Sequence, residues 1–268
     1  MPTWFLVLTV MVFGLLLGSF ANVPIHRWPR GGDVLEPKRS ACPSCDSEIA
    51  ARDNVPVVSW LFLRGRCRSC GTSIHWRYPF VESVVAALFA LIAVVEGATW
   101  LLPVHLALAW SLVVATVIDL EHQIIPNRLT YRLPVALLVL LVPPTLWGPG
   151  SPDDLVRALV AAVVVPGLVE LLSQMYRLVR GRRGFGLGDV KFLVSLGLVC
   201  GYLGVFEVVV LVYGAIVAAV LVAVPLMATG RAGLASRIPF GPYLAAGALT
   251  AVLAGDALRG PALGWLGL

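Results

Sequence analysis

Long apolar runs are the feature that most constrains this chain. The runs reach eighteen residues or more, the length that crosses a bilayer as a helix. They are continuously apolar and do not alternate, which favours helices over a membrane barrel. Only 13% of the 268 residues are charged, whereas an ordinary soluble domain carries about 25%. The sequence therefore predicts an all-α polytopic membrane protein.

The apolar runs predict about eight transmembrane helices. Their expected ranges are 3–25, 79–97, 100–119, 131–147, 154–178, 189–203, 205–228 and 240–257. Three glycines, Gly197, Gly201 and Gly204, interrupt the sixth run. The sixth helix could therefore merge with the seventh.

The basic residues predict the orientation of the helices. Of the 20 lysines and arginines, 18 lie in the loops that follow odd-numbered helices, and only Arg157 and Arg259 fall on the other side. Loops rich in Lys and Arg stay in the cytoplasm, so both termini are expected outside. This topology accounts for the net charge of +5, so the expected surroundings are membrane lipid and no nucleic-acid partner is needed. The first segment has no basic residues before its apolar run, so we expect an anchor and not a cleaved signal peptide.

Four of the five cysteines form two C-x-x-C pairs in the first cytoplasmic loop. They are Cys42, Cys45, Cys67 and Cys70, with 21 residues between the pairs. Two such turns aim four thiolates at one point, which is the pattern of a tetrahedral zinc site. Two disulfides are the alternative, but the reducing cytosol disfavours them. Four thiolates leave no open coordination position, so one structural zinc ion is expected in a small domain.

Two acids, Asp119 and Asp189, are placed as a pair by the predicted topology. Asp119 ends the third helix as it reaches the cytoplasm, and Asp189 opens the sixth helix as it leaves the cytoplasm. Two carboxylates that meet at one depth do not both ionise easily, so one can act as a base on water and the other as an acid. This is the chemistry of aspartic-protease hydrolysis. An ordinary acid at a helix N-terminus is the alternative for Asp189.

The stretch before Asp189 has glycine at alternate positions. Gly184, Gly186 and Gly188 leave one side of the backbone without side chains. Such a backbone permits close approach by another extended chain.

The other acids near the membrane are weaker candidates. Glu82, Glu96 and Glu207 lie near helix ends, where a structural interfacial role is favoured. Glu170 lies deeper, and its role is open. Two residues that closely follow Asp119 are also set aside. Glu121 is expected to be solvated, and His122 to be a loop residue or a supporting residue.

Several motifs together resemble the type IV prepilin peptidases, the leader peptidases of pilus and type II secretion systems. The stretch LGSFANVPIHRWPR (17–30) is similar to the N-terminal signature of that family, and CPSC and CRSCG to its cysteine tetrad. VIDLEHQIIPN (117–127) and GLGDVK (186–191) resemble its two aspartate motifs, the second being the GxGD pattern of intramembrane aspartyl proteases. IPFGPYLAAG (238–247) is similar to its C-terminal motif. The resemblance covers nearly the whole chain.

The resemblance implies that Asp119 and Asp189 are catalytic. It implies cleavage of a short basic leader from prepilins or pseudopilins, at the cytoplasmic face of the bacterial inner membrane. Many members also methylate the new N-terminus with S-adenosylmethionine, and their cysteine domain is tied to that step. Asp46 departs from the family pattern, in which glycine or another neutral residue follows the first cysteine pair.

The expected domains are a first helix at 1–25, a cytoplasmic four-cysteine zinc domain at 26–78 and a transmembrane protease core at 79–268. Two alternatives stay open beside this interpretation. One is a leader peptidase without methyltransferase activity. The other is a transporter or channel with a cytoplasmic zinc domain, which would place its acids near the bilayer midplane. Only Glu170 approaches that depth.

Overall fold

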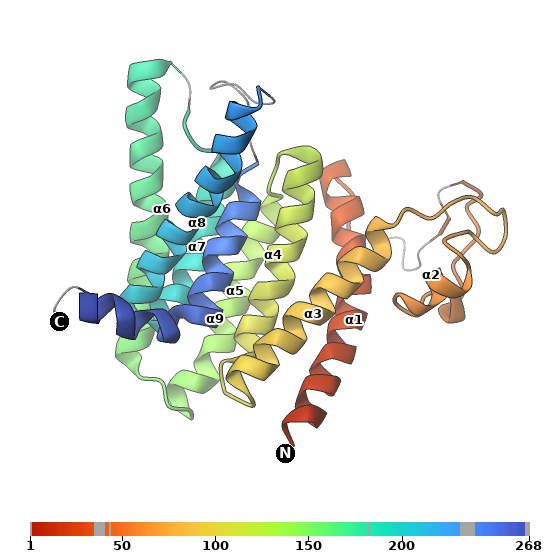
Figure 1. The fold of residues 1–268 in the computed structure, drawn as a ribbon, viewed down its shortest axis with the longest axis horizontal. Coiled ribbons are helices and arrows are strands. Elements are labelled where there is room, and N and C mark those ends of the chain that lie inside the picture. The colour runs from red at the N-terminus through yellow and green to blue at the C-terminus, as the bar shows by residue number, and fades with distance from the viewer. Residues whose placement is uncertain (1, 35–40, 43, 182, 231–238, 266–268) are drawn as a thin grey trace. The chain divides into compact units, whose positions relative to one another are not determined.

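The computed structural model describes residues 2–34, 41–42, 44–181, 183–230 and 239–265. Within these ranges the chain is almost entirely helical, and its only β structure consists of two isolated bridges. The helices are α1 (Thr3–Arg27), η1 (Trp28–Arg30), η2 (Ala51–Asp53), α2 (Val58–Phe62), α3 (Arg77–Glu96), α4 (Leu102–His122), α5 (Asn127–Leu146), α6 (Pro152–Arg180), α7 (Leu187–Leu203), α8 (Val205–Ala228) and α9 (Gly241–Trp265) (Figure 1).

The predicted all-α membrane fold is confirmed. Each of the eight expected helices corresponds to one long helix, α1 or α3 to α9. Their ends differ from the prediction by at most four residues, except that α9 ends at Trp265 and not at residue 257. In the described part of the chain, six helices are long and apolar enough to cross a membrane. The other two are α7, which has 17 residues, and α9, in which the apolar stretch found among the described residues is Gly241–Gly255.

Some residues used in the topology prediction lie outside the described ranges. They are Lys38, Arg39, Arg182, Arg231 and Arg237, together with Pro43 of the first cysteine pair, Ile238 of the C-terminal motif and residues 35–40, which precede the first cysteine pair.

The chain divides into two compact units, Met1–Leu102 and Pro103–Leu268. In the first unit, α1 and α3 lie side by side (Figure 1). Glycine allows their close approach, because a Cβ at Gly14 would lie 2.8 Å from Cα of Ala86, and one at Gly18 would lie 2.7 Å from Cα of Glu82. Small residues four apart are a common device for packing membrane helices. The predicted domain boundary at residue 79 stays a prediction, and the structure adds that α3 packs with α1.

In the second unit, α6 packs along α7 and α8 packs along α9 (Figure 1). Gly197 and Gly201 do not break α7. They bring it against α6, since a Cβ at Gly197 would lie 2.8 Å from the carbonyl oxygen of Ala161, and one at Gly201 would lie 2.5 Å from Cβ of Ala161. Gly204 ends α7, so α7 and α8 are separate helices.

Local sequence explains where α6 begins and ends. The Ser151 hydroxyl accepts a hydrogen bond from the backbone of Asp154, whose carboxylate accepts one from the backbone of Ser151, which is a capping box. Gly181 ends the helix in the left-handed conformation, with φ of 72°. The loop that follows leads to Asp189.

Candidate active site and metal centre

Asp119 lies in the last turn of α4, and only 4% of its surface is exposed. Its carboxylate accepts a hydrogen bond of 2.7 Å from the backbone N–H of Gly241, the first residue of α9. The N-terminus of a helix offers unpaired N–H groups and a positive dipole end, so it favours a carboxylate. A Cβ at Gly241 would lie 2.9 Å from Oδ2 of Asp119, and glycine therefore keeps this contact open.

Asp189 lies in the first turn of α7 and is half-buried. Its carboxylate lies close to Gly186, the residue that caps the helix, and the Gly186 backbone favours the ionised form of that carboxylate. The charge of Asp119 acts on Asp189, so the two carboxylates are close enough to interact. The two acids that the sequence had paired thus interact electrostatically, and each lies beside the N-terminus of a helix.

The turn after α4 packs against the start of α7. Gln123 adopts a positive φ of 55°, and the chain then runs through the buried Ile125 into α5. A Cβ at Gly188 would lie 3.2 Å from Cβ of Ile125. This packing fixes the helix that carries Asp189 against the turn that follows Asp119.

A lysine links α7 to the start of α5. Nζ of Lys191 donates a hydrogen bond of 2.9 Å to Oδ1 of Asn127, and it lies 4.9 Å from the ring centroid of Tyr131. Both partners belong to the start of α5. Lys191 therefore ties the GLGDVK stretch to the PN pair that begins α5.

Two aromatic rings join the loop before α7 to the start of α9. Phe185 and Phe240 meet edge to face, with ring centroids 5.2 Å apart. The backbone N–H of Phe185 also donates to the hydroxyl of Ser173 on α6. Three elements, α6, α7 and α9, are thus connected beside the acid pair.

The two glycines predicted to admit a substrate backbone make close contacts within the protein. A Cβ at Gly186 would lie 2.9 Å from Oδ2 of Asp189, and Gly188 contacts Ile125 as described above. Both glycines therefore have a structural reason to lack a side chain. Approach by a substrate stays a prediction.

The other acids have partners of their own. The buried carboxylate of Glu207 pairs with Arg259, and Glu170 pairs with Arg183 at 3.5 Å. Glu82 is also buried, and its carboxylate accepts a hydrogen bond from the backbone N–H of Val57. Glu96 is half-buried at the end of α3.

The residues that closely follow Asp119 are exposed. Glu121 and His122 are the last two residues of α4, and their side chains lie 3.9 Å apart. This exposure matches the solvated or supporting roles expected for them.

The four cysteines of the first unit form one cluster. All four Sγ atoms lie within 4.8 Å of one another, and those of Cys42 and Cys70 are 3.8 Å apart. Four thiolates at about 2.3 Å from a zinc ion would be about 3.8 Å from each other at the corners of a tetrahedron. None of the cysteines forms a disulfide. The cluster could hold a metal ion.

The two cysteine turns have the same backbone design. Isolated bridges flank each turn, Ala41 with Glu48 and Arg66 with Ser73. The residue after each pair takes a positive φ, 53° at Asp46 and 72° at Gly71. The departure noted in the sequence thus falls at a position that favours glycine.

Hydrogen bonds within the turns shift the pKa values of the thiols. They lower the pKa of Cys45, Cys67 and Cys70, and Ser47 and Thr72 supply the largest effects at Cys45 and Cys70. At Cys42 the backbone of Ser44 lowers the pKa, but burial and the neighbouring thiols raise it to about 11. Most of the cluster is therefore biased toward the thiolate that binds a metal.

Sequence reasoning did not find the role of Gly241, Lys191 or the two phenylalanines. A weak signal existed at Gly241, because Pro242 in the next position is typical of a helix start. A helix start near a carboxylate would have been a reasonable expectation. Nothing in the sequence pointed to Asp119 as its partner, 122 residues away.

The fold and the sites define a multi-pass helical membrane protein with a cysteine metal cluster and a pair of interacting acids. Residues 12–95 match the bacterial peptidase A24 N-terminal domain, and residues 106–224 match the type IV leader peptidase family. The chain belongs to the type IV leader peptidase family.

Several curated relatives align along most of the chain. The prepilin leader peptidase/N-methyltransferase of Stutzerimonas stutzeri is 37% identical over 274 residues, which cover 93% of this chain and 91% of the relative. The protein of the same name from Pseudomonas aeruginosa is 37% identical, with coverage of 93% and 91%. That of Aeromonas salmonicida is 32% identical, with coverage of 95% and 93%. No solved structure matches the chain.

Proposed function

We propose that this protein is a bifunctional enzyme of the bacterial inner membrane that removes the leader from prepilins or pseudopilins and then methylates the new N-terminus. The family match and the names of the relatives support both activities. The observation that supports the peptidase assignment is the electrostatic interaction between Asp119, in the last turn of α4, and Asp189, in the first turn of α7.

The two acids would divide the work of hydrolysis. One carboxylate takes a proton from water, and the resulting hydroxide adds to the carbonyl carbon of the scissile peptide. The other carboxyl first donates its proton to the carbonyl oxygen, and the leaving amine is protonated as the C–N bond breaks. Their surroundings differ, since Asp119 is buried against the start of α9 and Asp189 is half-buried, and unequal environments are how paired carboxyls take unequal roles.

We also propose that this reaction takes place at the cytoplasmic face, with both termini outside. The support is the excess of Lys and Arg in the odd-numbered loops. A prepilin stem is itself a membrane helix, so it can diffuse laterally to the enzyme with its basic leader on the cytoplasmic side. Cytosolic water then reaches the scissile bond without a deep channel.

The cysteine cluster would hold one structural zinc ion. The 3.8 Å separation of Cys42 and Cys70 fits tetrahedral zinc, and four thiolates leave no position for substrate. Metal analysis of the purified enzyme should find one zinc per chain. Cys70→Ser should release it, and Cys200→Ser, which changes a buried cysteine of α7 outside the cluster, should retain it. Zinc absent from the wild type would contradict the assignment.

S-adenosylmethionine would supply the methyl group. When bound, it would supply the methyl group from its sulfonium sulfur to the amine nitrogen. The sulfur would remain as a neutral thioether, and the amine would lose a proton to water. The chain's own part is to hold the donor and to present the new N-terminus.

Mass analysis of a prepilin tests both activities at once. The purified enzyme is incubated with a prepilin, with and without S-adenosylmethionine. We expect loss of the leader in both reactions and one added methyl group only with the donor. An intact prepilin would overturn the peptidase proposal. Leader loss without methyl addition would overturn the methyltransferase part and favour the peptidase that only cleaves.

A further inference from the structure

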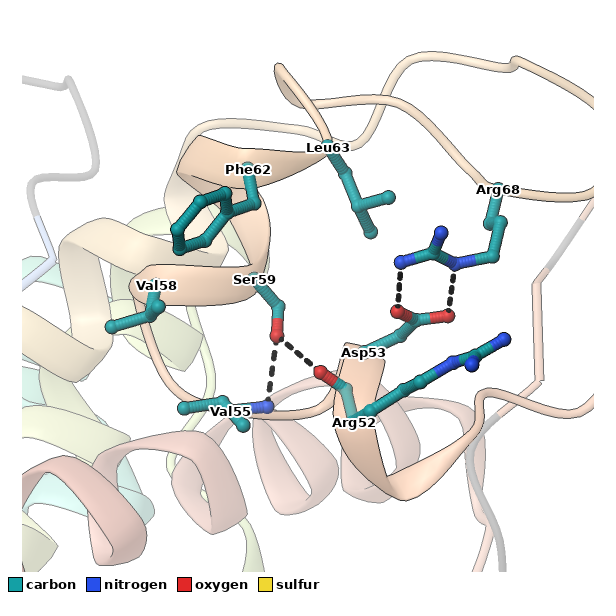
Figure 2. A pocket seen from close by; sticks show the side chains of 8 residues that line it. All are labelled: Arg52, Asp53, Val55, Val58, Ser59, Phe62, Leu63 and Arg68. Carbon is teal, nitrogen blue, oxygen red and sulfur yellow. Dashed lines mark hydrogen bonds and ion pairs between the residues drawn. The ribbon is translucent and has the colours of Figure 1, made fainter.

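The first unit contains a hollow of about 470 Å³ beside the cysteine cluster. Small-molecule sites usually measure about 300–1,000 Å³. Figure 2 shows its lining, which comes from the segment that includes η2 and α2 and from Arg68. None of these residues takes part in the acid pair of the second unit.

One wall of the hollow is an ion pair. Nε and Nη2 of Arg68 donate hydrogen bonds of 2.8 and 2.7 Å to the two carboxylate oxygens of Asp53. These bonds lower the pKa of Asp53, so it stays ionised at neutral pH. Arg68 lies between Cys67 and Cys70, so the position of this wall depends on the second cysteine turn.

The opposite wall is apolar and unusually exposed. The Phe62 side chain is 84% exposed and that of Val58 is 45% exposed, both on α2 (Figure 2). A phenylalanine that projects so far into solvent, next to a hollow, is a ready surface for a flat ring.

The turn that leads into this wall is held rigidly from two sides. The Ser59 hydroxyl accepts from the backbone N–H of Val55 and donates to the carbonyl of Arg52 (Figure 2). Val57 takes a φ of 60°, a rare value for a β-branched residue, and its N–H donates to the buried carboxylate of Glu82 on α3. Strained backbone that the surroundings enforce is concentrated at functional sites.

A second cation is available at the rim. Arg52 lines the hollow, and its charge acts on Asp53. Its guanidinium makes no hydrogen bond or ion pair with any residue that the structure describes. A guanidinium in this state can receive a ligand carboxylate in a bidentate manner.

We propose that this hollow binds the methyl donor, with the adenine ring on Phe62, the ribose hydroxyls on the Asp53 carboxylate and the methionine carboxylate on Arg52. This inference rests on the methyl transfer proposed above. S-adenosylmethionine combines a flat aromatic ring, neighbouring hydroxyls, a cationic sulfonium and a carboxylate. Among the described residues, the hollow offers an aromatic face, a fixed carboxylate and an unpaired guanidinium, which suit the ring, the hydroxyls and the carboxylate of this ligand in turn. Because Arg68 lies between Cys67 and Cys70 and holds Asp53, loss of the metal should also disturb the hollow.

Binding of S-adenosylhomocysteine, measured by calorimetry on the full-length zinc-loaded enzyme in nanodiscs, tests the proposal. Phe62→Ala and Arg52→Ala should each weaken binding at least tenfold. Two matched controls remove the same kinds of side chain from outside the hollow, namely Leu61→Ala on the same helix and the exposed Arg66→Ala. Both controls should bind like the wild type.

Two outcomes would overturn the proposal. One is binding that Phe62→Ala and Arg52→Ala leave within twofold of the wild type. The other is a wild type that cleaves prepilin but binds no S-adenosylhomocysteine. A wild type that binds it at this site but cleaves no prepilin would instead support the hollow and overturn the peptidase proposal, so the two failures are distinct.

Discussion

Replacing Gly241 by alanine tests the link between α9 and Asp119 with one added methyl group. The new Cβ would lie 2.9 Å from Oδ2 of Asp119 and 3.2 Å from its Cβ, so either the carboxylate or the start of α9 must move by a few tenths of an ångström. This movement would lengthen the 2.7 Å hydrogen bond from the Gly241 N–H. We expect slower leader cleavage by a folded enzyme.

The size of the effect follows from the bond that is weakened. A hydrogen bond to a charged group contributes about 1.5–3 kcal/mol. Since each 1.36 kcal/mol is a factor of about ten in rate, its complete loss would slow cleavage by about 10- to 150-fold. A partial loss gives a smaller factor, so we expect at least a severalfold decrease in kcat/KM.

The assay is the initial rate of leader removal from a prepilin in detergent or liposomes. Gly167→Ala is the matched control, because it adds the same methyl group to α6 where no atom lies within 4 Å. The control should cleave at the wild-type rate. Wild-type activity in Gly241→Ala would refute the idea that this contact positions Asp119.

Three further predictions concern the cysteine turns, the helix packing and the metal. Asp46→Gly should stabilise the metal-bound cysteine domain by up to about 1 kcal/mol, because the positive φ no longer strains a side chain. Competition with a chromophoric chelator should show tighter zinc binding by Asp46→Gly and weaker zinc binding by Gly71→Ala. The reverse order of the two affinities would contradict this prediction. Gly201→Leu should destabilise the protein by about 1–3 kcal/mol or more, because a Cβ there would already lie 2.5 Å from Cβ of Ala161. Thermal unfolding in detergent measures the loss of stability. An unchanged unfolding midpoint would rule out close packing of α7 against α6 at this position. Removal of the metal by a chelator should abolish methyl addition while leader cleavage persists, since the acid pair lies in the second unit and the cysteine cluster in the first. Equal loss of both activities would contradict the separation of the two sites.

The helices and the grouping of the candidate site residues could be predicted from the sequence because they depend on local patterns. Apolar runs of membrane length give the helices, and two C-x-x-C turns give the metal cluster. To predict the pairing of Asp119 with Asp189, it was enough to count the membrane crossings, because that count puts both acids on the same side of the membrane. These features need no knowledge of which helices touch.

The contacts that hold the site could not be predicted because they join distant parts of the chain. Gly241 supports Asp119 from another helix, and nothing local in the sequence links the two positions. Gly197 and Gly201 were expected to interrupt their helix, yet they pack it against α6. Without the partner helix in view, a glycine that breaks a helix and a glycine that packs it look the same. Glu82 was assigned to the membrane interface, but it is buried and binds the turn at Val57.

Leader cleavage by Asp119→Asn and Asp189→Asn tests the central claim most directly. Asparagine keeps the size and shape of each side chain but can neither take up nor release the proton that hydrolysis needs. Glu121→Gln is the matched control, since it neutralises an exposed acid in the same last turn of α4. We predict that both aspartate variants stay folded and lose cleavage of a prepilin, while the control retains it. Substantial cleavage by either aspartate variant would contradict the assignment of the pair as catalytic.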